Sequence, residues 1–367
     1  MILRLTRTFP RNKFNGVGLS AYYLQKFTNK SNIIFTKKIN SKILKLKKRN
    51  VLIEIDYKDL KFNQKNIINF IPILITKIYG EIIFFTKIYK YLKQKSINPS
   101  IIHVHSINYI FSGILLKSLY DIPLFLNFTG SDFYRLKKLK ILNLIISKVN
   151  KVFNVSKKIN NELIILFKNN KKFIHTSNGF DNKIFKNKNL KRKNQFVAVG
   201  NLRWQKNYEK MIYAFKLFTK KNNKYKLLII GSGDKFEKQN LIEIIKKNSL
   251  EKFVYLKGNL NHKEIAKILN ESYLFLMSSK SEGLPKSLIE AIACGTPIIT
   301  TNAGDCSYVA KDCGIILDYK CSEIQYSRAI IKLISNKQKW KKFRLNCLKK
   351  KYQFSWKKYV AKINKYY

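Results

Sequence analysis

The chain has 367 residues, which suits two domains of ordinary size better than one. Its net charge is +52, from 73 Lys and Arg against 21 Asp and Glu. Such a charge is typical of proteins that bind nucleic acid or anionic membranes. However, the basic residues are spread over both halves, and lysine far outnumbers the arginine that base-reading proteins use. We therefore expect no specific nucleic-acid partner, whereas an anionic membrane surface stays possible.

Cysteine and hydropathy patterns predict a protein of the cytoplasm. The five cysteines form no C-x-x-C pair, which predicts reduced thiols, and the four histidines show no metal-ligand spacing. No signal-peptide pattern is visible. The most apolar window, residues 67–89, is interrupted by Pro72, Lys77, Glu81 and Lys87. This window therefore predicts no comfortable transmembrane helix.

Strands and helices alternate through the first half of the chain. Residues 2–8 read as a strand, and the turn around Gly16 precedes a helix that starts near Leu19. A glycine-containing turn of this kind lets backbone approach a phosphate, although such glycines are more often structural. Further strands are predicted at residues 51–55, 100–105, 123–128, 152–156 and 173–178.

Polar residues follow two of these strands. His105 ends the strand at 100–105, and Thr129 and Asp132 follow the strand at 123–128. Parallel α/β sheets bind ligands at the carboxyl ends of their strands, so these three residues are candidates for a ligand site. Residues 135–149 predict an amphipathic helix, which either packs on its own sheet or lies on a membrane surface.

The alternation restarts after a polar, basic stretch at residues 187–194, the best candidate for a linker. Strands are predicted at residues 195–199, 225–230, 253–256, 273–277, 298–301 and 314–317, and helices at 208–219 and 236–248. The pattern predicts two Rossmann-like, doubly wound parallel-sheet α/β domains that face each other across a cleft. They span residues 1–188 and 195–351, with the helical segment 352–367 returning to the first.

Residues 281–301, SEGLPKSLIEAIACGTPIITT, combine a loop, a short helix and a buried strand. Glu282 and Glu290 are eight positions apart, so a continuous helix would place them on one face, roughly 12 Å apart. Amide groups at a helix N-terminus attract anions such as phosphate. The stretch favours either a phosphate-containing ligand held between two carboxylates or an amphipathic helix with two solvated glutamates.

Four elements of the chain could bind an anion: the Gly16 turn, the loop from Arg203 to Lys206, the turn from Gly231 to Gly233, and the start of the Glu282 helix. No Walker A loop, no G-x-S-x-G elbow, no strict G-x-G-x-x-G and no metal-ligand spacing is present. Together these observations favour a phosphate-bearing substrate held by lysine, arginine and amide dipoles without a metal.

The run of residues 196–314 resembles the C-terminal domain of retaining glycosyltransferases of family four (glycosyl transferases group 1), which have the GT-B fold. The matching pieces are VAVGNLRWQKN, LLIIGSGD, YLKGNLNHKEI, SSKSEGLPKSLIEAIACGTPIITTNAGD and CGIILD. The N-terminal half matches more weakly, through the Gly16 turn, IIHVHS, TGSD, NVSKKI and NGFDNKIF. The resemblance covers essentially the whole chain.

The resemblance implies transfer of a sugar from a UDP- or GDP-sugar with retention of configuration and without a metal or other cofactor. By analogy, Glu282 and the amides of Gly283 and Leu284 hold the donor sugar, and Glu290 binds the ribose hydroxyls. The leaving phosphate itself takes the acceptor proton in the mechanism favoured for the family, so Glu282 is not assigned as a nucleophile.

The same analogy gives roles to the phosphate-binding elements. Lys206, with Arg203 beside it, would neutralise the departing diphosphate, and the Gly16 turn would contact the phosphates. Gly231 and Gly233 belong to the donor-binding loops.

Two positions depart from the family pattern. Asn201 stands where the family usually has arginine, which leaves the role of Arg203 open. Thr129 stands where a histidine is common, so Thr129, Asp132 or His105 would have to replace that histidine.

We therefore predict a cytoplasmic enzyme, peripheral on the inner face of the plasma membrane, that glycosylates a glycan or lipid-linked acceptor in surface polysaccharide or lipopolysaccharide biosynthesis. Two alternatives remain. One is a non-catalytic basic protein that binds nucleic acid or membranes on the same fold. The other is a GT-B epimerase or phosphorylase.

Overall fold

The computed structural model describes residues 1–6, 19–37, 50–55, 70–128, 130–138, 140–220 and 222–367. Gly16 and Thr129 therefore lie outside the described residues. The chain divides into two compact units. Unit 1 comprises Met1–Val155, Ile159–Thr176 and Tyr359–Tyr367, and unit 2 comprises Ser156–Lys158 and Ser177–Lys358.

Unit 1 is built on a parallel sheet of seven strands in the order β3-β2-β1-β4-β5-β6-β7. Short apolar runs form these strands, because a sheet covered on both faces buries successive side chains on both sides. The strands are β1 (Ile2–Thr6), β2 (Asn32–Lys37), β3 (Asn50–Ile55), β4 (Ile101–Val104), β5 (Leu124–Phe128), β6 (Lys151–Asn154) and β7 (Phe173–His175).

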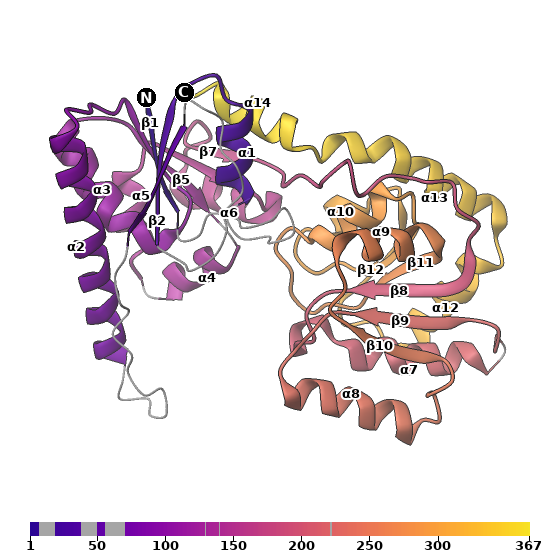
Figure 1. Ribbon diagram of the computed structural model, residues 1–367. Coiled ribbons are helices and arrows are strands. Elements are labelled where there is room, and N and C mark those ends of the chain that lie inside the picture. Colours follow the sequence, from indigo (N-terminus) through magenta and orange to yellow (C-terminus); the bar gives the residue numbers. More distant parts are fainter. Residues whose placement is uncertain (7–18, 38–49, 56–69, 129, 139, 221) are drawn as a thin grey trace. The chain divides into compact units, whose positions relative to one another are not determined.

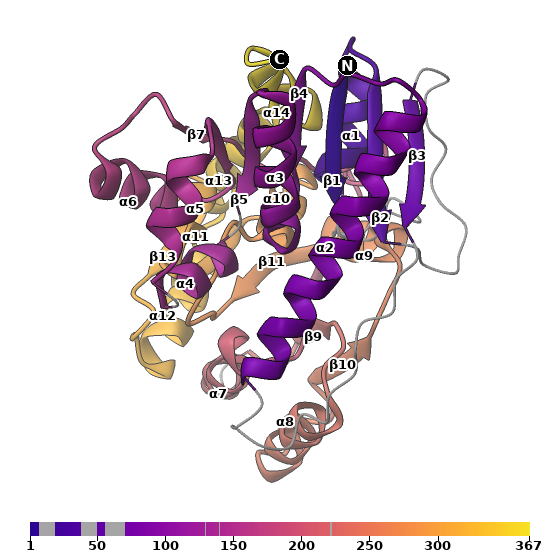
Figure 2. The same ribbon diagram turned by 90° about the vertical axis from the view of Figure 1, so that its left-hand side faces the viewer.

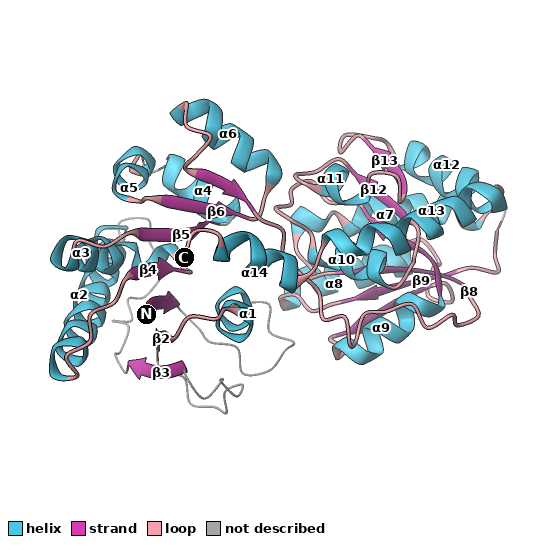
Figure 3. Ribbon diagram, turned by 90° about the horizontal axis from the view of Figure 1, so that it is seen from above, coloured by secondary structure: helices cyan, strands magenta, loops and turns pink. Residues whose placement is uncertain are grey.

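Helices cover both faces of this sheet (Figures 2 and 3). The helices α2 (Phe70–Gln94), α3 (Ile110–Tyr120) and α5 (Leu142–Lys148) lie on one face, with α1 (Leu19–Phe27) and α14 (Trp356–Asn364) on the other. The remaining helices of this part of the chain are η2 (Ile107–Tyr109), α4 (Gly130–Lys138) and α6 (Lys157–Phe167).

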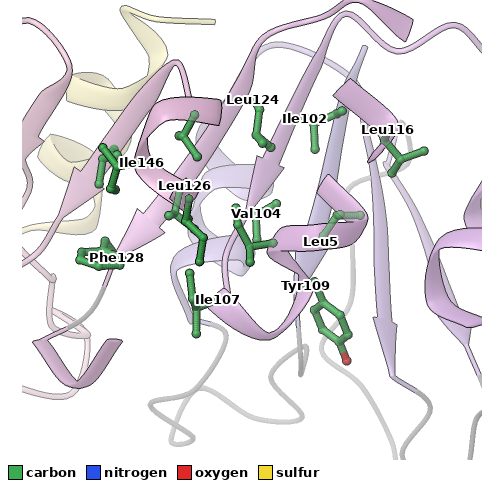
Figure 4. Packing of buried hydrophobic residues seen from close by; sticks show 14 of the residues in the cluster. Leu5, Ile102, Val104, Ile107, Tyr109, Leu116, Leu124, Leu126, Phe128 and Ile146 are labelled. Atoms are coloured by element: carbon green, nitrogen blue, oxygen red, sulfur yellow. The ribbon is translucent and has the colours of Figure 1, made fainter. Parts of the chain in front are cut away.

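The hydrophobic core of unit 1 lies between the central strands and the α3 side (Figure 4). Leu5, Val104 and Leu126 come from β1, β4 and β5, and they belong to one buried cluster with Tyr109 and Leu116. These branched side chains are buried, and burying each one contributes roughly 1.5–3 kcal/mol to folding. The core thereby fixes the strands at whose carboxyl ends the candidate residues lie.

The last residues of the chain pack against unit 1. The Asn127 amide donates a hydrogen bond to the Tyr359 hydroxyl at 3.0 Å, and Arg4 donates one to the Tyr367 hydroxyl at 2.6 Å. Residues 359–367 thus complete the face of the sheet that α1 also covers. Residues 177–188, which the sequence analysis assigned to the first domain, belong to unit 2.

The amphipathic helix predicted at residues 135–149 is two helices. Lys140, between α4 and α5, has a positive φ of 56°, which a continuous right-handed helix excludes. The apolar residues of α5, Leu142, Ile145 and Ile146, are buried in the core of unit 1. Packing on its own sheet is therefore the correct interpretation of this segment.

Unit 2 contains a second parallel sheet, of six strands in the order β10-β9-β8-β11-β12-β13. Its strands are β8 (Lys193–Val199), β9 (Lys226–Ile230), β10 (Val254–Gly258), β11 (Ser272–Met277), β12 (Ile298–Thr301) and β13 (Gly314–Leu317). Its helices are η3 (Trp204–Lys206), α7 (Tyr208–Thr219), α8 (Lys235–Lys247), α9 (His262–Glu271), α10 (Lys286–Ala293), α11 (Cys306–Ala310), α12 (Glu323–Ile334), α13 (Lys337–Lys350) and η4 (Lys351–Gln353). The predicted class, two doubly wound parallel-sheet α/β domains, is confirmed.

The predicted linker is anchored to unit 2 by Arg192. Arg192 donates hydrogen bonds to the carbonyl oxygens of Leu269, Ser272, Cys294 and Gly295 at 2.6–3.2 Å, and one to Thr296 Oγ1 at 3.0 Å. Several of these carbonyls lie at the ends of α9 and α10, where helix carbonyls lack partners within the helix. Arg192 therefore ties the start of β8 to both helices.

No helix in the described ranges is both long and apolar enough to span a lipid bilayer.

Candidate active site

The topology of unit 2 points to the position of a ligand site. The strand order 10-9-8-11-12-13 reverses direction between β8 and β11. In open parallel sheets, ligands bind outside the carboxyl ends of the strands at this switch point. The loop that follows β8 carries Lys206, and the loop that follows β11 carries Glu282.

Lys206 and Glu282 form an ion pair at the switch point. The Lys206 Nζ to Glu282 Oε1 distance is 2.6 Å, and the side chains are 21% and 11% exposed. The Ser279 hydroxyl donates a second hydrogen bond to the same Oε1, also at 2.6 Å. Two residues that are 76 positions apart in sequence are thus placed together, and one carboxylate oxygen already accepts two hydrogen bonds.

Hydrogen bonds from the end of β11 hold the Lys206 loop in place. The Ser278 hydroxyl lies 3.0 Å from the Lys206 carbonyl oxygen and 2.7 Å from that of Asn207. The Lys280 amide donates to the Gln205 carbonyl at 2.7 Å. Asn207 takes the left-handed conformation, with a φ of 51°, and so ends η3 immediately before α7. These bonds fix the backbone that positions the Lys206 ammonium group.

The two glycines of the loop after β9 permit close packing against the Lys206 loop. A Cβ on Gly231 would lie 2.0 Å from the Gly200 carbonyl oxygen, and one on Gly233 would lie 2.4 Å from that of Leu202. Gly231 also has a φ of 149°. Gly231 and Gly233 therefore have a clear structural reason to be glycine, in addition to any direct contact with a ligand.

The loop that carries Glu282 is held by the residues that follow β12. The Asp305 amide donates a hydrogen bond to the Gly283 carbonyl at 3.1 Å, and a Cβ on Gly304 would lie 1.9 Å from the Glu282 carbonyl oxygen. A Cβ built on Gly283 itself meets no atom of the described residues within 4 Å. The backbone of Gly283 is thus fixed on one side and accessible on the other, whereas the Leu284 side chain is buried.

Glu290 begins the second turn of α10 and is partly buried, whereas Glu282 lies in the loop before this helix, so the two glutamates do not share one continuous helix. Burial raises its pKa to about 7, and the neighbouring Lys286 ammonium partly offsets this effect. Burial likewise lowers the pKa of Lys286, which Glu290 partly restores. Glu290 therefore changes its charge close to neutral pH, unlike an ordinary surface glutamate.

A small, open recess lies beside the ion pair. It is lined by Lys206, Tyr208, Ser278 and Ser279, together with apolar side chains of β8, β11 and α7. The Tyr208 hydroxyl donates to the Gly200 carbonyl at 2.9 Å. Burial, followed by the charge of Glu282, raises the pKa of Tyr208, so its hydroxyl stays protonated. Arg203 is exposed, three residues before Lys206 in the same loop.

The candidate site residues of unit 1, His105 and Asp132, lie in surroundings that differ from those of the Lys206–Glu282 ion pair. His105 is part of a buried network in which the Asn127 amide donates to its Nδ1 at 2.8 Å and the His103 ring stacks on it at 4.2 Å. Burial, then the charges of His103 and Arg4, lowers the pKa of His105 well below its usual value of 6.5, so the imidazole is neutral. Asp132 is half-buried in the first turn of α4.

The sequence analysis missed Ser278, Ser279 and Tyr208, because isolated hydroxyl residues carry no spacing signal. It also missed the environment of His105, namely Arg4, His103 and the C-terminal Tyr367. Across the described residues, no group of three His, Cys, Asp or Glu side chains is arranged to hold a metal ion.

Comparison with known proteins identifies the family. Residues 179–353 match the family described as glycosyl transferases group 1. This part of the chain belongs to that family. A relative in Erwinia amylovora, the amylovoran biosynthesis glycosyltransferase AmsD, is 34% identical over 157 residues, which cover 42% of this chain and 42% of that protein. The match thus spans less than half of that relative.

Several solved structures are similar to the chain over its whole length. Sucrose-phosphate synthase from Thermosynechococcus elongatus has a TM-score of 0.80 at 15% identity and covers 100% of this chain and 98% of its own. The Anabaena protein HepE in complex with UDP-glucose has a TM-score of 0.75 at 14% identity and covers 100% and 99%. These likenesses show that the chain has the GT-B fold.

Proposed function

We propose that the chain is a retaining glycosyltransferase that moves a sugar from a UDP- or GDP-sugar to a glycan or lipid-linked acceptor, without a metal. The observation that carries the proposal is the Lys206–Glu282 ion pair at the switch point of the unit 2 sheet. The match to group 1 and the UDP-glucose bound by HepE support a nucleotide-sugar as the donor. The likeness to AmsD supports a role in surface polysaccharide biosynthesis.

In this proposal Lys206 offsets the charge of the departing diphosphate. A fixed ammonium group aimed at developing negative charge stabilises a transition state more than it stabilises the substrate. The bonds from Ser278 and Lys280 hold the Lys206 loop in advance, so little reorganisation is needed. Arg203, Gly231 and Gly233 are assigned to the same donor side, as is the Gly16 turn by resemblance.

Glu282 is assigned to binding the donor sugar rather than to attack on it. Its Oε1 accepts hydrogen bonds from both Lys206 and Ser279, which reduces the availability of its lone pairs. The accessible side of Gly283 allows the sugar to approach the backbone beside it. Glu290 is assigned to the ribose hydroxyls, for which a carboxylate is a bidentate acceptor.

The test is turnover of nucleotide-sugars by wild type and variants. Lys206→Ala and Glu282→Ala are expected to reduce transfer or donor hydrolysis at least 100-fold, the scale seen when one preorganised charge partner is removed. The matched control is Lys193→Ala, which breaks a second ion pair of unit 2, with Glu271 at 2.9 Å. Turnover that is unaffected by the first two variants would refute the site. The configuration of the product, measured by NMR, decides between retention and inversion.

We also propose that unit 1 binds an anionic membrane surface, through α3. Phe111, Leu115 and Leu119 follow one another at intervals of four residues and are 41–56% exposed, so they form one apolar stripe. Exposed lysines lie on the adjacent helices, among them Lys90 on α2 and Lys148 on α5. An apolar stripe with a lysine border is typical of helices that lie in a membrane interface.

Sedimentation with vesicles that contain phosphatidylglycerol tests this surface. Leu115→Glu is expected to reduce binding, because it places a negative charge among the apolar residues. Ile165→Glu is the control, since Ile165 is 76% exposed on α6. Equal binding by both variants would show that α3 is not the contact.

A further inference from the structure

Two large aromatic side chains are exposed beside the Lys206 loop. Trp204 lies in η3 and is 62% exposed, and Phe236 is the second residue of α8 and is 80% exposed. Each ring leaves a large apolar area in contact with water. Neither residue is explained by the site described above.

The structure brings the two residues to the same edge of unit 2. Trp204 precedes α7 and Phe236 opens α8, and these helices follow the neighbouring strands β8 and β9 (Figure 1). The Trp204 amide donates a hydrogen bond to Glu237 Oε1 at 3.0 Å, which ties the turn of Trp204 to the first turn of α8. The Leu202 amide donates to the Ser232 carbonyl at 2.8 Å in the same pair of loops. The rings are therefore carried on braced backbone.

Polar side chains surround these rings. The Asn240 amide donates to Glu209 Oε1 between α8 and α7, and Glu237 lies next to Phe236. These carboxylates lie among basic residues of the same loops and helix starts, namely Arg203, Lys206, Lys210, Lys235 and Lys238. We call Trp204, Phe236, Glu209, Glu237 and Asn240 the aromatic platform.

We infer that the aromatic platform binds the pyranose rings of a neutral glycan chain. The C–H face of a pyranose packs on an aromatic ring, and carboxylate and amide groups bond its hydroxyls. The inference rests on the proposed function, because it makes the platform a subsite for the acceptor or the product beside the donor site.

The position of the platform also argues against the nucleobase of the donor. The proposed ribose ligand Glu290 lies on α10, which follows β11, whereas the platform lies on the loops after β8 and β9. Lys206, the proposed diphosphate ligand, belongs to the same loop as Trp204. A ring held by the platform is therefore on the side of the proposed diphosphate ligand and away from the proposed ribose ligand.

Tryptophan emission gives a direct assay on the full chain. The chain has three tryptophans, and Trp340 and Trp356 are only 8% and 5% exposed, so Trp204 is the one in contact with solvent. Maltotriose, cellotriose and chitotriose are titrated separately, without any nucleotide-sugar. At least one of them is expected to shift or quench the emission, and Trp204→Phe is expected to abolish that signal.

Two aromatic substitutions show whether the sugars bind at the platform or elsewhere on the surface. Phe236→Ala is expected to weaken the best of these ligands about tenfold, the scale of one lost aromatic contact. Tyr352→Ala removes another aromatic side chain, 66% exposed, and should change nothing. An unchanged emission with all three sugars, or equal binding by wild type and Phe236→Ala, would overturn the inference.

Hydrolysis of the nucleotide-sugar shows whether a negative result refutes the platform or the proposed donor site. Phe236→Ala is expected to keep the hydrolysis of the nucleotide-sugar in water, whereas Lys206→Ala is expected to lose it. If the platform variants bind normally while Lys206→Ala is inactive, only the platform is refuted. If Lys206→Ala is fully active, the donor site is wrong, whatever the sugars do.

Discussion

The charge of Glu290 gives a quantitative prediction about the pH dependence of donor binding. Burial raises its pKa to about 7, so the free protein carries the ionised form in roughly 10% of molecules at pH 6 and roughly 90% at pH 8. The ionised carboxylate accepts bonds from both ribose hydroxyls, whereas the protonated acid has lost one acceptor position. The KM for the nucleotide-sugar is therefore expected to fall about tenfold from pH 6 to pH 8.

A nucleotide-sugar is the correct ligand for this assay, because both of its phosphates are esterified and do not titrate between pH 6 and pH 8. Glu290→Gln is expected to raise KM and to remove its dependence on pH. His262→Gln is the control, because burial lowers the pKa of His262 and its titration lies at lower pH. A KM that changes with pH equally in wild type and Glu290→Gln would refute the assignment of Glu290 to the ribose.

Three further predictions concern stability, measured by denaturant unfolding. Burial raises the pKa of Glu81 to about 8, so the native state loses about 4 kcal/mol of stability between pH 4.5 and pH 8, and Glu81→Gln should remove most of that loss. Burial lowers the pKa values of His103 and His105, so below pH 6.5 the unfolded chain takes up protons that the native state does not. The free energy of unfolding should therefore fall by about 1.4 kcal/mol per pH unit for each histidine. His105→Asn should reduce that slope. Arg192→Met leaves five oxygen atoms without their donor and should destabilise unit 2 by about 3 kcal/mol or more. A variant whose free energy of unfolding has the same size and the same pH dependence as that of wild type would contradict the corresponding prediction.

Periodicity predicted most strands because each is a short apolar run between polar turns. The helix predicted at 208–219 has the observed bounds of α7, and most strands of unit 2 agree within two residues. Strand β2 was missed, because its apolar part is only Ile33, Ile34 and Phe35 and it gains its stability from pairing with β1 and β3. The break between α4 and α5 was missed too, because no glycine or proline marks Lys140.

The candidate site could be predicted only in part. The contact between Lys206 and Glu282 joins residues that no local pattern connects. The sequence marked each of them as part of a separate anion-binding element, and the family resemblance assigned both to the donor. Their actual geometry is a mutual ion pair shared with Ser279, which the resemblance did not imply. In the sequence, Arg192 is one more basic residue of the predicted linker. The sequence does not show which carbonyl oxygens its side chain will bind.

Calorimetric titration of UDP into wild type, Lys206→Ala and Lys193→Ala tests the central claim most directly. If Lys206 faces the diphosphate, its replacement should raise the Kd of UDP at least tenfold, since about 1.4 kcal/mol or more of charge pairing is lost. Lys193→Ala, in the ion pair with Glu271, should bind UDP like wild type. Equal affinity in all three proteins would show that the diphosphate does not bind at the Lys206–Glu282 pair.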